Sequence, residues 1–289
     1  MPNRQSEISK AAVSRSVGQA SLWAPEATGS LTAKGQCLQD RKPPCWLIVL
    51  CASILFSCAP APVSSPQPSQ PVIVTLTFDD GDADNFPAAA RLQQYSLHAT
   101  FYIPSGLVGR AGYMTWDQLQ ALQQAGNEIG GHSLDHMKLS GLDSPALRHE
   151  VCDDRTNLIN HGFTPISFAY PFGNYDPNVK AMLKECGYAG ARTIRGGPQV
   201  MPPSDPYGVL AFPYIVSDTD LGKLQRYING TRSQGGGWVI LTFHHVCDAC
   251  DYFAVHPDVW NAFVPWLARQ QSVHQLQVKT FGEVITGKP

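Results

Sequence analysis

The sequence is poor in charge, has no basic cluster and has no long apolar run. Charged residues make up 15% of the 289 residues and hydrophobic residues 43%, with a formal net charge of −2. This balance is typical of a globular chain and excludes a disordered or fibrous one. Because no basic cluster stands out, nucleic acid and anionic membrane surfaces are poor candidate partners. The length allows one large domain or two small ones.

The longest apolar run, from Trp46 to Phe56, is well short of the roughly 20 residues that a transmembrane helix needs. It follows two basic residues and has the size of a signal-peptide core. Leu55-Phe56-Ser57-Cys58 resembles the cleavage box of bacterial lipoproteins, which would make Cys58 the lipidated first residue. Secretory cleavage without a lipid is the alternative. We therefore predict an N-terminal extension and signal peptide (1–57), a Pro/Ser-rich tether (58–71) and a catalytic domain (72–289).

The predicted location is the bacterial cell envelope, either as a membrane-anchored lipoprotein or as a secreted protein. Membrane contact would be made only through the lipid at Cys58. Residues 1–40 are long for a signal peptide, which an over-extended gene start would explain. The sequence leaves the oligomeric state unknown.

Export would place the remaining cysteines in an oxidising compartment. The folded domain keeps an even number of them. Cys247-Asp-Ala-Cys250 has the spacing of a zinc half-site or a redox pair, but no second Cys-x-x-Cys and no thioredoxin-like context accompany it. We favour two structural disulfides, Cys152–Cys186 and Cys247–Cys250.

From residue 72 onward, strand and helix signals alternate. "TWDQLQALQQAG" opens with a Thr-x-x-Gln capping box and closes on glycine. Such alternation favours a parallel sheet, and its repeat number favours an α/β fold with a distorted (β/α) barrel of about seven parallel strands. Predicted strands are 72–78, 99–103, 127–131, 166–170, 188–192, 238–243 and 276–280, with a weaker one at 212–216; predicted helices are 84–97, 115–126, 144–162, 176–186, 219–233 and 257–271. The Gly/Pro-rich residues 195–208 are predicted to form a long rim loop.

Polar residues recur immediately after these strands. Asp79-Asp80 follow the first strand, His132 and His136 the third, and His244-His245 the strand "WVILTF". Asp-Gly pairs also close strands as simple turns, and aspartate caps helices. Residues that act only as turns would also occur at the amino ends of strands, whereas these gather at the carboxyl ends, where catalytic residues of β/α barrels collect.

The chemistry of these residues favours a divalent metal ion. The histidines in "HSLDH" are four apart, which brings both rings together if the segment turns helically. Two imidazoles and a carboxylate form a common site for zinc, with cobalt or nickel as alternatives. Adjacent carboxylates point apart on an extended backbone, so one can bind metal while the other acts as a base. The sequence has no His-Glu-x-x-His, which excludes the usual zinc-protease arrangement.

Together these motifs resemble the polysaccharide deacetylase family of carbohydrate esterases. "TFDDG" (77–81), "HSLDH" (132–136), "YPFG" (170–173) and "LTFHH" (241–245) stand in the family's order. The resemblance implies a distorted β/α barrel and metal-dependent removal of N- or O-acetyl groups from sugars. It assigns the general base to Asp79, the metal ligands to Asp80, His132 and His136, and the general acid to His244, with His245 a weaker choice.

The same resemblance assigns a substrate-contacting segment, Tyr170-Pro171-Phe172, with a backbone N–H at Phe172 that would hold the oxyanion. The rings of Tyr170, Phe172 and Tyr175 are candidates for stacking on a sugar. The tryptophans at 116, 260 and 266 are better explained by packing.

Two departures from the family pattern stand out. The arginine that normally precedes the proline by two residues, and orients the base, is replaced by Ala169. We expect Arg192, at the end of the next strand, to take its place. The aspartate–tryptophan motif that tunes the acid histidine is reduced to "SDTDL", so Asp218 and Asp220 are weak candidates there.

Three functions stay open at this point. The first is deacetylation of an N-acetylglucosamine polymer such as exopolysaccharide, peptidoglycan or chitin. The second is the same chemistry on acetyl esters of xylan-type polymers or on a non-sugar amide. The third is an inactive, surface-anchored sugar-binding protein, which the complete motif set disfavours. The motifs do not separate amide from ester, because one metal site serves both.

Overall fold

The computed structural model describes residues 71–273 and 275–288. The chain divides into two units, Met1–Pro60 and Ala61–Pro289, and the described residues lie in the second. The predicted signal peptide, Cys58 and the predicted tether up to residue 70 lie outside the described residues. Within the described part, no helix combines the length and apolar character that a membrane crossing requires.

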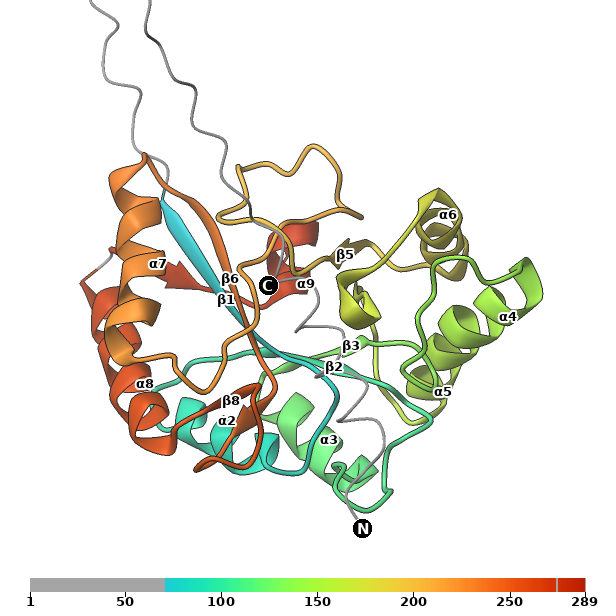
Figure 1. Cartoon of the computed structure of the whole chain (residues 1–289), viewed down its shortest axis with the longest axis horizontal. Coiled ribbons are helices and arrows are strands. Elements are labelled where there is room, and N and C mark those ends of the chain that lie inside the picture. The colour runs from blue at the N-terminus through green and yellow to red at the C-terminus, as the bar shows by residue number, and fades with distance from the viewer. Residues whose placement is uncertain (1–70, 274, 289) are drawn as a thin grey trace, which may run out of the picture. The chain divides into compact units, whose positions relative to one another are not determined.

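A parallel sheet forms the centre of the fold (Figure 1). Its strand order is β5-β4-β3-β2-β1-β6, and β9 also pairs with β1. The sheet and its surrounding helices form a distorted (β/α) barrel, which confirms the predicted fold. The strands are β1 (Val72–Phe78), β2 (Thr100–Ile103), β3 (Glu128–Gly131), β4 (Ser167–Ala169), β5 (Gly190–Arg192), β6 (Gly237–Phe243) and β9 (Leu276–Val278).

The edge between β5 and β6 is bridged by an irregular segment, residues 209–215. Val209 pairs with Arg192 of β5 in an isolated bridge. Further along, the N–H groups of Phe212 and Ile215 donate to carbonyl oxygens of β6. The weak strand predicted at 212–216 is therefore wrong as a regular strand, although its backbone does run along β6.

Helices surround the sheet (Figure 1), with α7 and α8 on one side and α4, α5 and α6 on the other. The predicted capping box is present at Thr115 and Gln118, before α3. The helices are α2 (Asn85–Gln93), α3 (Trp116–Gln124), α4 (Ser144–Arg148), α5 (Asp154–Asn160), α6 (Pro177–Cys186), α7 (Leu221–Ser233), α8 (Pro257–Ser272) and α9 (Phe281–Thr286).

The single helix predicted at 144–162 is interrupted by one π-helical turn, η1 (His149–Asp153), between α4 and α5. Such π-bulges are frequent at functional sites. The disulfide Cys152–Cys186 ties this turn to the end of α6, and Cys247–Cys250 closes a loop next to the short strands β7 (His245–Val246) and β8 (Ala254–Val255). Both favoured cysteine pairings are thus present.

Side-chain alternation along the strands separates two environments. On the outer face, Phe78 of β1 stacks on Phe101 and Phe243, with Trp260 of α8 edge-on against it. The inner face is more polar: the indole N–H of Trp238 donates to Thr75, for example. Helices cover the outer face, so polar groups at the inner carboxyl end are the ones left free for chemistry.

Candidate active site at the carboxyl ends of the strands

The alternation within the strands carries four functional side chains to the inner face. Asp79 continues the inward series of Thr75 and Thr77, and His244 directly follows Phe243 at the end of β6. His132 follows β3 in the same way, and Arg192 ends β5. All four are at least nine-tenths buried. Residues far apart in the chain therefore meet at one end of the barrel.

Asp80, His132 and His136 form a compact group of potential metal ligands. Asp80 Oδ1 lies 3.3 Å from His132 Nε2 and 3.2 Å from His136 Nε2. The spacing of the two histidines suggested a helical turn, but they do not lie on one. They lie on a loop in which Ser133 and His136 have left-handed backbone conformations, with φ of 66° and 56°, and their rings are 4.9 Å apart.

The hydrogen bonding of this group fits a cation. His132 Nδ1 donates to the carbonyl oxygen of Ala169 at 2.7 Å, so in the neutral ring the lone pair is on Nε2, on the side of Asp80. Asp80 Oδ1 is buried and accepts no well-aligned hydrogen bond from the described residues. Lone pairs that face one another repel unless a positive ion lies between them. Two imidazoles and one carboxylate are a suitable donor set for zinc or a similar divalent ion.

The ionisation of these groups is compatible with that role. Burial raises the pKa of Asp80, but the imidazoles of His136, His132 and His244 outweigh it and hold that pKa well below its usual range. Burial lowers the pKa of His136 to about 4. Burial also acts to lower the pKa of His132, but Asp80 and Asp79 raise it overall. Asp80 is thus ionised and His136 neutral, the forms that bind metal.

The π-helical turn supports the loop that carries the histidines. The main-chain oxygen of Glu150 accepts from Leu134 N–H at 2.9 Å, and its carboxylate accepts from Asp135 N–H at 3.2 Å. Glu150 is itself 3% exposed. On the other side, Gly106 N–H donates to the carbonyl oxygen of Leu134 at 2.8 Å. These bonds hold a loop whose left-handed residues would be unfavourable alone.

The candidate base, Asp79, is paired with Arg192 in a buried ion pair. The guanidinium lies over the ring of Tyr102, 4.8 Å from its centroid. Gly130 makes room for this ring, because a Cβ there would lie 2.7 Å from it. The structure therefore brings Arg192 to the carboxylate that the arginine missing at Ala169 would have contacted.

The two adjacent histidines after β6 lie in different surroundings. His244 Nε2 is 3.9 Å from Asp80 Oδ2, across the candidate metal group, and burial lowers the pKa of its imidazole. His245 instead lies between Asp82 and Asp84, at 3.4 and 3.2 Å. Burial opposes a charge on His245, but the two carboxylates outweigh it and raise its pKa to about 9. His245 thus has a structural partner on each ring nitrogen.

Within the Tyr170-Pro171-Phe172 segment, Phe172 lies beside the site and Tyr170 lies away from it. Phe172 has φ of 59°, its ring contacts His136 at 4.8 Å, and 45% of it is exposed. The N–H of Phe172 is the first backbone donor after Pro171, and none of the backbone hydrogen bonds found among the described residues uses it.

The expectation that Tyr170 contacts the sugar is wrong. Its ring is fully buried on the outer face, and its hydroxyl donates to the carbonyl oxygen of Tyr207, so it cannot stack on a sugar.

Three further expectations need correction. The ring of Tyr175 is engaged by Tyr170 and Lys180, which leaves no free face for a sugar. Residues 195–208 do not form a rim loop over the site, because Gln199 pairs with Trp238 at the amino end of β6 (Figure 1). Asp218 and Asp220 flank the start of α7, with side chains 80% and 71% exposed, and contact Lys223 and Arg226 rather than His244.

Sequence reasoning missed Tyr214 and Phe253, two aromatic residues beside His244. They come from an irregular segment and from a loop, so no periodicity marks them. Tyr214 lies 4.7 Å from the imidazole of His244 and Phe253 lies 5.3 Å from it, between ring centroids.

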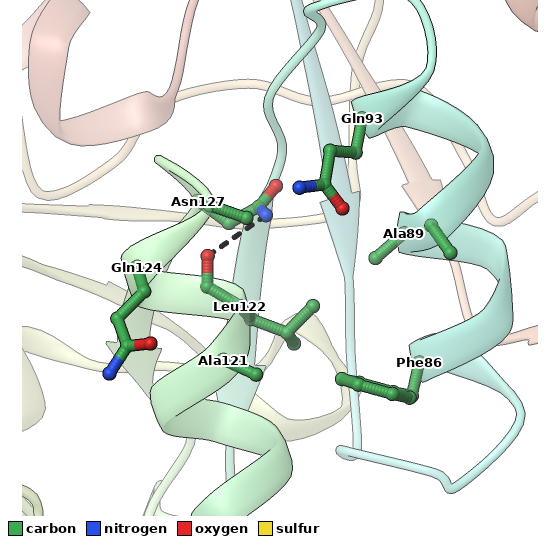
Figure 2. A pocket seen from close by; sticks show the side chains of 9 residues that line it. Phe86, Ala89, Gln93, Ala121, Leu122, Gln124 and Asn127 are labelled. Carbon is green, nitrogen blue, oxygen red and sulfur yellow. Dashed lines mark hydrogen bonds between the residues drawn. The ribbon is translucent and has the colours of Figure 1, made fainter.

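Two features elsewhere do not join this site. Asp84, His245 and Cys250 lie within ligand distance of one another, but Cys250 is bonded to Cys247 and His245 is engaged by Asp84. A groove of about 290 Å³ lies between α2 and α3 (Figure 2). Its lining is largely apolar or amide and contains no titratable group: Phe86, Ala89, Ala90, Gln93, Ala121, Leu122, Gln124, Ala125 and Asn127.

The barrel carries a carboxylate–imidazole group that could hold a metal ion, a buried base candidate and a histidine opposite them. This arrangement fits a metal-assisted hydrolase. Residues 67–191 match the model of the polysaccharide deacetylase family. Over those residues the chain is similar to this family, as the motifs indicated. The match includes the candidate metal ligands but ends before Arg192 and His244.

Known proteins similar to the chain include two from Bacillus. YxkH of Bacillus subtilis is 30% identical over 128 residues, which cover 43% of this chain and 45% of that protein. A peptidoglycan-N-acetylglucosamine deacetylase of Bacillus cereus is 28% identical over 123 residues, which cover 42% of this chain and 56% of that protein. The chain thus spans about half the length of these relatives.

Among solved structures, the fold resembles an acetyl xylan esterase of Clostridium thermocellum that was solved with a cobalt ion. The TM-score is 0.53 at 22% identity, and the similarity covers 75% of this chain and 93% of the esterase. At that identity the likeness concerns the fold alone.

Proposed function

We propose that the protein is a metal-dependent hydrolase that removes N-acetyl groups from an N-acetylglucosamine-containing polysaccharide. The observation that carries this proposal is the convergence at one end of the barrel of Asp79 on Arg192, of His244, and of the group formed by Asp80, His132 and His136. The similarity to a peptidoglycan-N-acetylglucosamine deacetylase supports the amide over the ester.

A divalent ion, for which zinc is the first choice, would be held by Asp80, His132 and His136 and would supply Lewis acidity toward the acetyl carbonyl and toward water. Asp79 takes a proton from the attacking water, and Arg192 holds that carboxylate in place. In this proposal the N–H of Phe172 donates to the oxygen of the tetrahedral intermediate. His244 gives its proton to the leaving nitrogen as the C–N bond breaks, which yields acetate and a free amine.

We also propose that the protein acts on an extracellular polymer after export, with Cys58 as a lipid anchor. Two disulfides in the folded domain support an oxidising compartment. Labelling with a radioactive fatty acid in a bacterial host, compared between the wild-type chain and Cys58→Ala, tests the anchor. Equal labelling of both would exclude it.

The first test of the activity is acetate release from acetylated glucosamine polymers, acetyl-xylan and a non-sugar acetamide. The protein is stripped of metal and resupplied with zinc, cobalt or nickel, beside Asp79→Asn and the exposed control Asp218→Asn. We expect metal-restored release from the glucosamine polymers, which Asp79→Asn lowers by about 10²- to 10⁴-fold and Asp218→Asn leaves unchanged. Release from acetyl-xylan alone would favour the esterase. Sugar binding without release from any substrate would leave a binding protein.

The proposed role of Arg192 is tested by Arg192→Lys, which keeps the positive charge but loses the planar guanidinium. We expect lower acetate release with unchanged metal content, because Asp79 would lose its orienting partner while the ligand group stays intact. Full activity with an unchanged pH profile would remove Arg192 from the mechanism.

A further inference from the structure

The Nδ1 side of the His244 imidazole has no polar group to orient it. Nδ1 is buried and has no hydrogen-bond partner among the described residues, while Nε2 lies 3.9 Å from Asp80 Oδ2, too far for a hydrogen bond. The backbone is better fixed, since the side-chain amide of Asn85 donates to the carbonyl oxygen of His244. That bond holds the main chain but leaves rotation of the ring free. Contacts other than a hydrogen bond must therefore hold the ring.

Two aromatic rings surround the imidazole. The ring of Tyr214 lies 4.7 Å away at an interplanar angle of 78°, and that of Phe253 lies 5.3 Å away at 36°. The two rings also contact each other edge-on at 5.2 Å. Such geometries are the favoured ones for aromatic pairs. The imidazole therefore lies in a corner formed by two mutually packed rings.

Both rings are positioned by the backbone. The N–H of Ile215, next to Tyr214, donates to Thr242 O of β6 at 2.9 Å. Phe253 N–H donates to the carboxylate of Asp251 at 2.9 Å, just after the Cys247–Cys250 disulfide, and its carbonyl oxygen accepts from His245 N–H at 3.4 Å. The corner is thus built from two separate segments that are each fixed to the end of β6.

We propose that Tyr214 and Phe253 are positioning residues that hold the imidazole of His244 in line with the leaving group, in place of a carboxylate partner. This inference rests on the proposed function, because it concerns the proton that His244 delivers during hydrolysis. Packing contacts restrict the ring plane without a bond to Nδ1. Proton delivery by His244 therefore depends on the packing of these two side chains.

The role of the acid depends on the leaving group. An amine leaves only after protonation, whereas 4-nitrophenolate is a stable anion that leaves without help. Loss of the aromatic corner should therefore slow hydrolysis of an acetamido sugar and spare that of 4-nitrophenyl acetate. A general loss of structure or of metal would slow both reactions equally.

The test compares Tyr214→Ala and Phe253→Leu with Tyr214→Phe, in the full chain loaded with zinc. His244→Ala serves as the reference, and Asp248→Asn, which alters an exposed residue shortly before Phe253, as the control. We expect Tyr214→Ala to lower kcat on an acetylated glucosamine oligomer by about 10- to 100-fold, within the range of acid–base catalysis. Its rate on 4-nitrophenyl acetate should stay within about twofold, and Tyr214→Phe and Asp248→Asn should behave as wild type.

A second measurement does not depend on activity. NMR relaxation of the ¹³C-labelled histidine rings in metal-free protein, with the His244 signal assigned from His244→Ala, reports ring motion. We expect an ordered ring in the wild-type protein and in Tyr214→Phe, and a mobile one in Tyr214→Ala. Equal losses on both substrates, or unchanged ring order, would overturn the proposal. If the wild-type protein released no acetate at all, the proposed function would fail, and ring order alone would decide whether these residues position His244.

Discussion

The two sides of the candidate site are held by different forces. On the side of the metal group, His132 donates to Ala169, and Glu150 accepts two N–H groups of the loop that carries the histidines. On the side of the acid, the ring of His244 packs against two aromatic rings, and its Nε2 lies 3.9 Å from Asp80 Oδ2 without a hydrogen bond.

This difference matches the two tasks. A metal ligand needs one defined tautomer, and a hydrogen bond to Nδ1 provides it. A proton donor must instead exchange its proton during the reaction, and packing fixes its ring without fixing that proton. Only the metal side lies within residues 67–191, the part that matches the family model.

Removing one histidine from each side should separate the two tasks most clearly. We expect His132→Ala to lose the bound metal, because the chelating group keeps only two ligands. His244→Ala should keep the metal. Both variants should lose acetate release from an amide by about 10²-fold or more. Metal analysis of the dialysed proteins beside an acetate assay checks this.

Loss of metal from His244→Ala would contradict the separation, since it would make His244 a ligand. Retention of metal by His132→Ala would remove His132 from the ligand set.

The two disulfides should also differ in effect. Cys152–Cys186 joins residues 34 apart on the metal side, and Cys247–Cys250 joins residues 3 apart on the acid side. Because the entropy of loop closure grows with loop length, replacing the first pair by alanine should lower the free energy of unfolding by about 4 kcal/mol, and replacing the second by about 2 kcal/mol. Urea unfolding of the two double variants measures this.

The activity of the same variants sharpens the comparison. The Cys247→Ala/Cys250→Ala variant should slow amide hydrolysis more than nitrophenyl ester hydrolysis, because it loosens the segment that leads into Phe253. If the long-range pair gave the smaller loss of stability, the loop-length argument would not apply here.

Much of the fold and of the metal side could be predicted from the sequence. Strand alternation alone carries Asp79 and His244 inward, since Thr77 and Thr242 are two residues before them. The same reasoning, applied to "ISFAY", would have shown that Tyr170 points outward, because Ser167 lies on the inner face with Glu128. The expectation for Tyr170 was wrong because closeness to Phe172 in the sequence was taken for closeness to the site in space.

The acid side could not be predicted, for a physical reason. Tyr214 lies on an irregular segment and Phe253 in a loop, and neither has a period that assigns a face. The path of residues 195–208 was equally hidden, because the pairing of Gln199 with Trp238 is a long-range contact. Arg192 was predictable only because a strand end placed it.

Glu150 offers a finer test of the hydrogen-bonded side. We expect Glu150→Ala to weaken metal binding by about 10- to 100-fold, as changes behind metal ligands commonly do. Glu150→Gln should bind nearly as well as wild type, since its amide oxygen can still accept from Asp135 N–H. Competition with a chelator gives the metal affinity without any assay of activity. The same loss in both variants would show that charge, rather than hydrogen bonding, is what Glu150 provides.

The smallest expected effect concerns Asp154, behind the metal side. Its carboxylate is fully buried, accepts from Ser105 N–H at 3.1 Å and from the hydroxyl of Tyr188 at 3.2 Å, and burial raises its pKa from 3.8 to about 7. Between these values the folded state binds more protons than the unfolded state, so this group's contribution to stability is present below about pH 4 and is lost as pH rises to about 7.

Asp154→Asn should remove this dependence, because an amide keeps the acceptor for Ser105 and does not titrate. Relative to wild type, the variant should therefore be more stable at pH 8 than at pH 6, by a difference on the order of 1 kcal/mol. Urea unfolding of the metal-free proteins at both pH values measures it, with Asp218→Asn, an exposed carboxylate paired with Lys223, as the control. An unchanged difference between the two pH values would show that Asp154 is ionised in the folded protein. The metal side would then contain a buried charge, and its contrast with the uncharged aromatic corner around His244 would be greater still.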